Sequence, residues 1–127
     1  MIFMYPAVFE YDAENGGYCV TFPDLPGCFT QGDTQEEAMI YAQETMELYL
    51  EPDDDVAPEF PHPTDLTDIE QPESGFISYV TANVDLSKSS KYVRKNLTIP
   101  EWLNTRATQQ GINFSQVLQE ALVKRCY

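Results

Sequence analysis

Apolar residues near the start of the chain follow a two-residue period that predicts a small β-sheet. Residues 18–22 alternate, which places Tyr18, Val20 and Phe22 on one face of a strand. Residues 14–17 before them tolerate positive φ and predict a hairpin turn from an earlier, aromatic-rich strand. The strands predicted in this region span residues 2–11, 18–22 and 28–31, with a rigid turn over 23–27 before the third.

The pattern then changes to a helical period between residues 34 and 51. Thr34 and Glu37 form a capping box at its start, and Pro52 cannot continue the helix. Residues at helical spacing predict the side that faces the core: Ala38, Tyr41, Ala42, Thr45, Met46 and Tyr49.

The stretch after this helix has no periodicity. Residues 52–74 are rich in Pro and Asp and predict a long exposed loop, whereas residues 75–84 alternate and predict another strand. The resulting order, β-β-β-α-β, predicts an α+β fold in which one helix packs on a small sheet.

A second alternating segment, residues 93–99, precedes two further predicted helices. Its apolar and polar faces are, respectively, Val93, Leu97 and Ile99, and Arg94, Asn96 and Thr98. Pro100 suits the first turn of a helix that reaches about residue 110, with Leu103 and Ala107 facing inward, and Gly111 ends it. Asn113 caps the next helix, whose predicted buried stripe is Val117, Leu118, Ala121 and Leu122.

Charge divides the chain at about the same place. Residues 1–86 contain 19 Asp and Glu and no Lys or Arg, whereas residues 87–127 contain all seven Lys and Arg and two Asp and Glu. An acidic body is repelled by phosphates, while a basic tail suits them. The split therefore predicts two units with different partners.

The stretch from Tyr18 to Cys28, YCVTFPDLPGC, followed by Thr30–Thr34 and by Glu37-Ala38, resembles the HicB antitoxin family. The resemblance implies a truncated ribonuclease-H-like N-terminal domain that binds and masks HicA, a small basic ribonuclease toxin. It also implies a C-terminal DNA-binding domain, of either helix-turn-helix or ribbon-helix-helix type. From the motif we expect toxin contacts in the hairpin and the following turn, including Asp24, Leu25 and Cys28, and on exposed apolar or acidic helix residues.

The strand-helix-helix order after residue 92 is similar to a ribbon-helix-helix module, and the NLTIP run of residues 96–100 is typical of that class. A unit of about 40 residues buries too little surface to be stable alone, and a single strand leaves its backbone groups unpaired. Pairing with the same strand of a second chain solves both problems, so we expect a homodimer, with further pairing into tetramers left open. The predicted organisation is a toxin-binding domain over 1–86, a linker over 87–92 and a DNA-binding domain over 93–127.

A two-stranded antiparallel ribbon fits the major groove of B-DNA. The residues predicted to contact base edges are Arg94, Asn96 and Thr98. Those predicted to contact phosphates are Lys88, Lys91, Lys95, Asn113, Phe114 and Ser115, the last three because a helix N-terminus presents free N–H groups. Trp102 is expected at the dimer interface.

Taken together, these observations favour a non-enzymatic antitoxin that neutralises a HicA-type mRNA-cleaving toxin and represses its own operon by binding operator DNA. One alternative is a ribonuclease-H-like binding module whose C-terminal segment only oligomerises. The other is a Mg²⁺-dependent nuclease, since carboxylates are abundant, although such a site needs carboxylates that converge from separate elements.

Few residues suggest other chemistry. His62 stands alone on the predicted loop without a catalytic partner, and Cys19 and Cys28 have no histidine nearby to complete a zinc site. We therefore expect no catalytic residue, metal or cofactor. The absence of a long apolar run and of a basic leader, with only three scattered cysteines, predicts a cytoplasmic protein that does not enter membranes.

Overall fold

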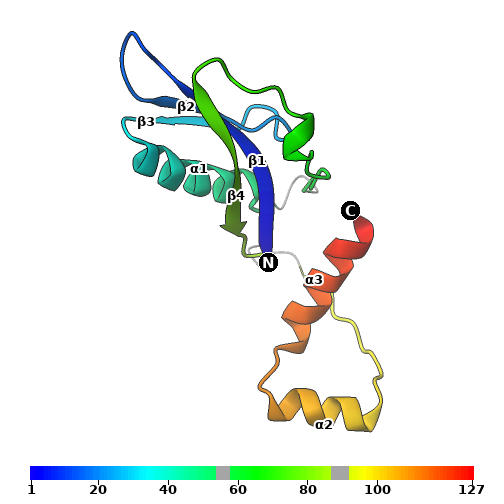
Figure 1. Ribbon diagram of the computed structural model, residues 1–127. Coiled ribbons are helices and arrows are strands. Elements are labelled where there is room, and N and C mark those ends of the chain that lie inside the picture. Colours follow the sequence, from blue (N-terminus) through cyan, green and yellow to red (C-terminus); the bar gives the residue numbers. More distant parts are fainter. Residues whose placement is uncertain (54–57, 87–91) are drawn as a thin grey trace.

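The structure is a computed structural model that describes residues 1–53, 58–86 and 92–127 (Figure 1). Its elements are β1 (Ile2–Tyr11), β2 (Tyr18–Thr21), β3 (Phe29–Gly32), α1 (Gln35–Leu50), the 3-10 helix η1 (Leu66–Asp68), β4 (Gly75–Asn83), α2 (Glu101–Gln109) and α3 (Phe114–Cys126). The α+β class and the β-β-β-α-β order of the N-terminal unit, residues 1–86, are confirmed.

The strands form one antiparallel sheet in the order β3-β2-β1-β4, and α1 covers one of its faces (Figure 1). The predicted hairpin joins β1 to β2, where the Asp12 N–H donates to the Gly17 carbonyl over 2.9 Å. Gly16 and Gly17 both have positive φ, which glycine adopts without steric cost. At the centre of the sheet Phe9 pairs with Val20 on one side and Phe76 on the other.

Helix α1 begins as expected, since the Thr34 hydroxyl accepts a hydrogen bond from the Glu37 N–H over 3.1 Å. Its buried residues are Ala38, Ala42, Met46 and Leu50. The prediction that Tyr41 and Tyr49 face the core is wrong, because both are exposed. The two alanines bring the helix backbone close to the sheet, and the tyrosine rings remain at its sides, where their hydroxyls reach polar partners.

The loop after α1 is only partly the exposed segment that the sequence predicts. Phe60 is buried and stacks on Phe3, with ring centroids 4.6 Å apart. The Tyr5 hydroxyl donates to the Pro61 carbonyl over 2.6 Å. We call residues 58–65 the strap, because they lie against the N-terminal unit and lead into η1. The sequence does not predict these contacts, because the segment is rich in proline and acidic residues and a single buried phenylalanine creates no periodicity.

The C-terminal unit, residues 92–127, contains the two predicted helices but no core of its own. Within this single chain residues 92–99 form no strand, and Ala107 is the only buried side chain among residues 92–127. Leu103 and the stripe predicted as buried on α3 are therefore exposed or half-exposed here. The helix ends follow the sequence: Gly111 has a φ of 69°, and the Asn113 side chain caps α3.

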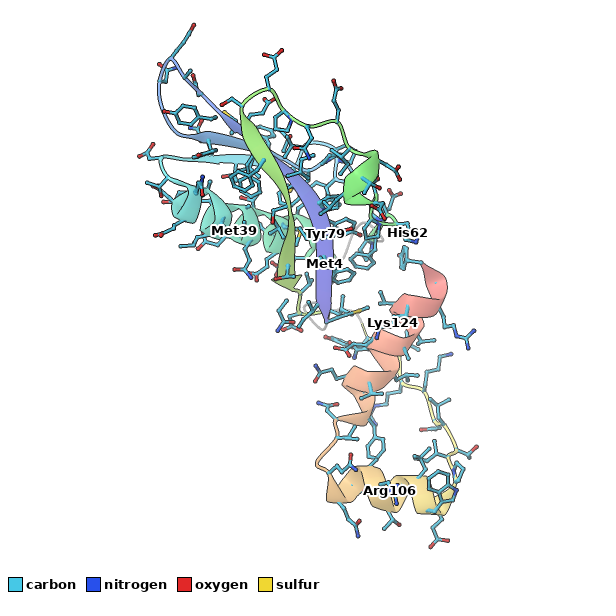
Figure 2. All side chains as sticks on the ribbon, viewed as in Figure 1. Met4, Met39, His62, Tyr79, Arg106 and Lys124 are labelled. Atoms are coloured by element: carbon cyan, nitrogen blue, oxygen red, sulfur yellow. The ribbon has the colours of Figure 1, made fainter. Side chains whose placement is uncertain are left out.

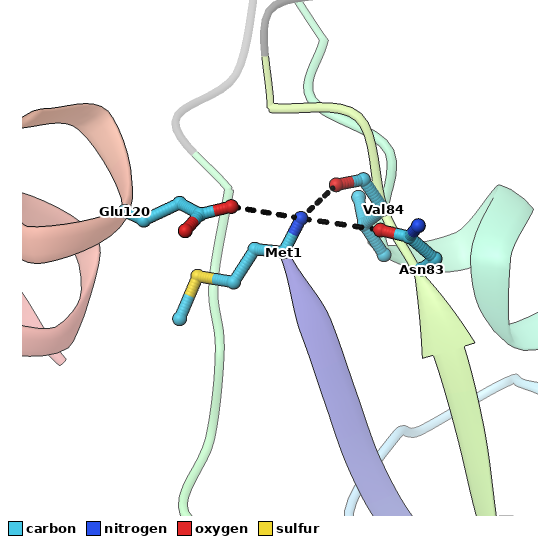
Figure 3. Close-up of polar contacts among 4 residues, drawn as sticks. All are labelled: Met1, Asn83, Val84 and Glu120. Atoms are coloured by element: carbon cyan, nitrogen blue, oxygen red, sulfur yellow. Dashed lines mark hydrogen bonds and ion pairs between the residues drawn. The ribbon is translucent and has the colours of Figure 1, made fainter. Parts of the chain in front are cut away.

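Helix α3 nevertheless contacts the N-terminal unit (Figure 3). The Met1 ammonium lies 3.3 Å from the Glu120 carboxylate and also donates to Asn83 and to the Val84 carbonyl. At the other end of α3, the Tyr127 hydroxyl donates to the Pro58 carbonyl. The two units are thus in contact, rather than joined through a linker alone.

Candidate partner-binding surfaces

The turn between β2 and β3, residues 22–28, is held by three backbone hydrogen bonds. The Phe22 N–H donates to the Cys28 carbonyl, the Leu25 N–H to the Phe22 carbonyl and the Cys28 N–H to the Leu25 carbonyl, over 3.0 to 3.3 Å. Gly27 has a φ of 80°, a conformation that disfavours other residues. The FPDLPGC motif therefore encodes one compact backbone shape.

The three residues predicted to contact a toxin do not all reach the surface of this turn. Leu25 and Cys28 are 1% and 4% exposed, and burial raises the pKa of the Cys28 thiol to about 11. Their side chains therefore support the turn from inside, and the exposed residues of the turn include Pro26 and Gly27. Sequence motifs do not separate these roles, because both kinds of residue fix the same turn.

Asp24 is half-buried and fastens the turn to the strap. Its carboxylate accepts hydrogen bonds from the Thr64 N–H over 2.9 Å and from the Thr64 hydroxyl over 2.5 Å. The Tyr5 hydroxyl lies close enough to Asp24 to be affected by its charge. Burial raises the pKa of Tyr5 to about 12, and the negative charge of Asp24 is the second cause. Asp24 is thus a structural anchor within the chain.

The outward face of α1 combines apolar and acidic side chains that are exposed, or half-exposed in the case of Glu47. We call it the α1 surface, and it consists of Ile40, Tyr41, Glu44, Glu47 and Leu48. Leu48 is the most exposed of its apolar residues, at 74%, and shares a shallow groove with Glu44 and Glu47. A hydrogen bond to the Glu37 carboxylate, together with neighbouring carboxylates, raises the pKa of Tyr41. The interleaving of apolar and acidic residues is visible in the sequence, but the predicted core face includes Tyr41, and nothing in the pattern singles out Ile40 or Leu48.

The C-terminal end of α1 lies beside the turn. The Tyr49 hydroxyl, at the last turn of α1, donates to the Pro26 carbonyl over 2.9 Å. This contact places the exposed side of the FPDLPGC motif beside the end of an acidic helix. Together they offer a basic protein both negative charge and exposed hydrophobic side chains.

The residues predicted to read DNA bases lie on the C-terminal unit. Arg94, Asn96 and Thr98 are exposed, and so is Lys95. Their apolar neighbours on the alternate face are exposed too, with Val93 at 83% and Leu97 at 64%. Lys88 and Lys91 lie outside the described residues. In Figure 2, the basic residues Arg106 on α2 and Lys124 on α3 lie in the C-terminal unit, apart from Met39 on α1 of the N-terminal unit.

Two of the three residues at the start of α3 that are predicted to contact phosphates line a groove that contains carboxylates. The Asn113 side chain accepts from the Gln116 N–H over 3.1 Å, so it acts as a helix cap. Phe114 and Ser115 are exposed, and Ser115 lines a groove that also contains Asp85 and Glu120. The Glu120 carboxylate is paired with the Met1 ammonium in the same groove, so Asp85 is the carboxylate there that the Met1 pair does not offset.

Other chemistry has little geometric support in the described part of the chain. Across residues 1–53, 58–86 and 92–127, no three His, Cys, Asp or Glu side chains converge as metal ligands would. His62 is exposed on the strap, beside the C-terminal end of α3 (Figure 2). No helix described here has both the length and the apolar character to cross a membrane.

Comparison with known proteins identifies relatives over nearly the whole chain. Residues 5–121 match the family described as HicB-like antitoxin of bacterial toxin–antitoxin system. An uncharacterised 14.9 kDa protein of Haemophilus phage HP1 is 36% identical over 110 residues, covering 84% of this chain and 80% of that protein. Antitoxin HicB 1 of Photorhabdus laumondii is 39% identical over 69 residues, covering 51% of this chain and 44% of the antitoxin.

Solved structures agree with this assignment. A toxin–antitoxin complex from Streptococcus pneumoniae contains a chain with 28% identity and a TM-score of 0.56, with 98% of this chain and 99% of that chain covered. The antitoxin HicB of Burkholderia pseudomallei has the same coverage, a TM-score of 0.62 and 24% identity, and therefore shows a shared fold.

Proposed function

The chain belongs to the family of HicB-like antitoxins of bacterial toxin–antitoxin systems, and we propose that its two units have separate binding tasks. The N-terminal unit, with a partial ribonuclease-H-like fold, binds and masks a HicA-type mRNA-cleaving ribonuclease. The C-terminal unit dimerises as a ribbon-helix-helix and binds operator DNA, which represses the operon. Both tasks are non-enzymatic.

One observation carries the proposal for the C-terminal unit: apart from the contacts of α3 with the N-terminal unit, most of the hydrophobic residues described in residues 92–127 are left exposed. Eleven large hydrophobic side chains of residues 92–127 are exposed, against one buried alanine. Exposed apolar surface of this extent marks a site of association. A second copy that contributes the same strand and helices would bury these residues in an isologous dimer.

The strand pattern supports DNA as the second partner. When Val93, Leu97 and Ile99 of two copies pack inward, Arg94, Asn96 and Thr98 face outward from a two-stranded ribbon. Arginine pairs with guanine and asparagine with adenine in the major groove. The positive charge concentrated in this unit supplies the attraction to phosphates that the N-terminal unit lacks.

The N-terminal unit suits a basic protein. It contains 19 carboxylate side chains and no Lys or Arg, so its field attracts a positively charged partner and raises the association rate. The α1 surface and the exposed side of the turn give such a partner hydrophobic contacts as well. We assign the toxin to this combined surface.

The direct test is a titration of a purified HicA-type toxin with the full-length protein while RNA cleavage is followed. We expect cleavage to fall to background near a fixed molar ratio, because masking by binding is stoichiometric rather than catalytic. A toxin that stays fully active in the presence of excess protein would reject the N-terminal assignment. RNA degradation by this chain alone would favour the nuclease alternative.

A substitution on the predicted ribbon tests the DNA assignment. Arg94→Ala should weaken binding to the operator by roughly 1–3 kcal/mol and relax the preference at one base position. Binding is measured by fluorescence anisotropy on operator and on random DNA of equal length. Equal losses on both DNAs would mean that Arg94 contacts phosphate only.

A further inference from the structure

One side of helix α3 contacts the N-terminal unit, and the opposite side is largely exposed. Glu120, Val123 and Tyr127 share one side at helical spacing, and this side contacts the N-terminal unit. Leu122 lies on the opposite side and Val117 on a flank next to Glu120, and both are exposed, at 53% and 52%. The helix can therefore pack on a second copy without releasing the N-terminal unit.

The C-terminal end of α3 holds one end of the strap. The Tyr127 ring packs edge-on against Phe60 with centroids 5.0 Å apart, and its hydroxyl donates to the Pro58 carbonyl. Phe60 in turn stacks on Phe3 of β1. Figure 1 shows α3 returning from α2 towards this part of the N-terminal unit.

The other end of the strap holds the FPDLPGC turn. Thr64 donates two hydrogen bonds to Asp24, and between the two ends Tyr5 donates to Pro61. The path from Tyr127 to Asp24 thus runs through one eight-residue segment with a contact at each end and in the middle. When such a segment has two conformations, a change in the contacts at one of its ends alters the contacts at the other end.

We propose that the strap couples the position of α3 to the FPDLPGC turn, so that fixing α3 in a dimer orders the turn for its protein partner. The functional meaning rests on the proposed assignment of that turn to toxin binding. Coupling between two sites is reciprocal, so a partner bound at the turn also stabilises the docked α3. Toxin binding and assembly of the C-terminal unit are then linked through the antitoxin chain itself.

The test is amide hydrogen exchange in the full-length protein, which needs no toxin and so separates this inference from the toxin assignment. Tyr127→Ala removes the ring and the hydroxyl from the strap. It should accelerate exchange of the Thr64, Leu25 and Cys28 amides by at least about fivefold, the lower end of typical couplings between sites. Tyr127→Phe, which keeps the ring on Phe60, should have a smaller effect in the same places.

Two controls make the result specific. Cys126→Ala changes an exposed neighbour on the same helical turn and should leave these amides at the wild-type rate. The reciprocal variant, Asp24→Asn, weakens the acceptor for Thr64 and should accelerate exchange of the Val123 amide, which lies inside α3 on the side that packs against the N-terminal unit. Acceleration confined to the altered end in both variants would overturn the proposal. So would uniform acceleration that includes the central Phe9–Val20 pair, because that pattern reports a global loss of stability.

Discussion

Leu97→Asp should prevent the proposed dimer from forming and leave a monomer. In the proposed ribbon Leu97 of each copy faces inward near the two-fold axis, so the substitution buries two unpaired carboxylates. Leaving one buried charge without a partner costs about 3–5 kcal/mol. The dimer dissociation constant should therefore rise by at least about a hundredfold, which sedimentation equilibrium measures directly. Operator binding should be lost with it, because one strand alone cannot form the ribbon.

Thr98→Asp is the matched control. It adds the same charge one residue away, on the face that the alternation directs outward. The dimer should persist, while operator binding should fall because a carboxylate faces the DNA. If both variants dissociate equally, or if Leu97→Asp remains dimeric, residues 93–99 do not pair with their symmetry mates. A normal thermal transition of the N-terminal unit in both variants confirms that the remainder of the chain is folded.

The parts of the fold that local chemistry decides could be predicted from the sequence. Two glycines with positive φ form the β1–β2 hairpin, and the Thr34 hydroxyl begins α1, both as expected. Periodicity was less informative about which side of α1 packs on the sheet. Tyr41 and Tyr49 lie at plausible spacing, yet a helix brought close by Ala38 and Ala42 leaves no room for their rings underneath.

Long-range contacts could not be predicted in the same way. The contact between Asp24 and Thr64 joins residues 40 positions apart, and the one between Pro58 and Tyr127 joins residues 69 positions apart. Neither leaves a pattern in the local sequence, because a loop backbone and a single side chain carry no period. The burial of Leu25 and Cys28 could not be predicted for a related reason. A motif indicates which residues a turn needs, but not whether their side chains are buried beneath the turn or exposed on its surface.

Leu48→Arg should weaken toxin binding by at least about 2 kcal/mol, the usual threshold for a residue that dominates an interface. That loss corresponds to about a 30-fold higher dissociation constant. Leu48 is 74% exposed and shares its groove with Glu44 and Glu47, so a basic partner gains a hydrophobic contact surrounded by opposite charge. Arginine removes the hydrophobic contact and places positive charge against a positively charged protein. Isothermal titration with the full-length variant measures the change.

Thr81→Arg provides the control for this substitution, because it adds the same charge to the same acidic unit at another exposed position. Thr81 lies on β4 between the buried Val80 and Ala82, so its side chain is on the face of the sheet opposite α1. Long-range attraction, which depends on net charge, changes equally in the two variants and weakens with salt. If Leu48 contacts the toxin, Leu48→Arg should bind the toxin more weakly than the control variant does at every salt concentration. If the two variants bind equally, the α1 surface supplies only its charge, and the hydrophobic contact with the toxin lies elsewhere on the N-terminal unit.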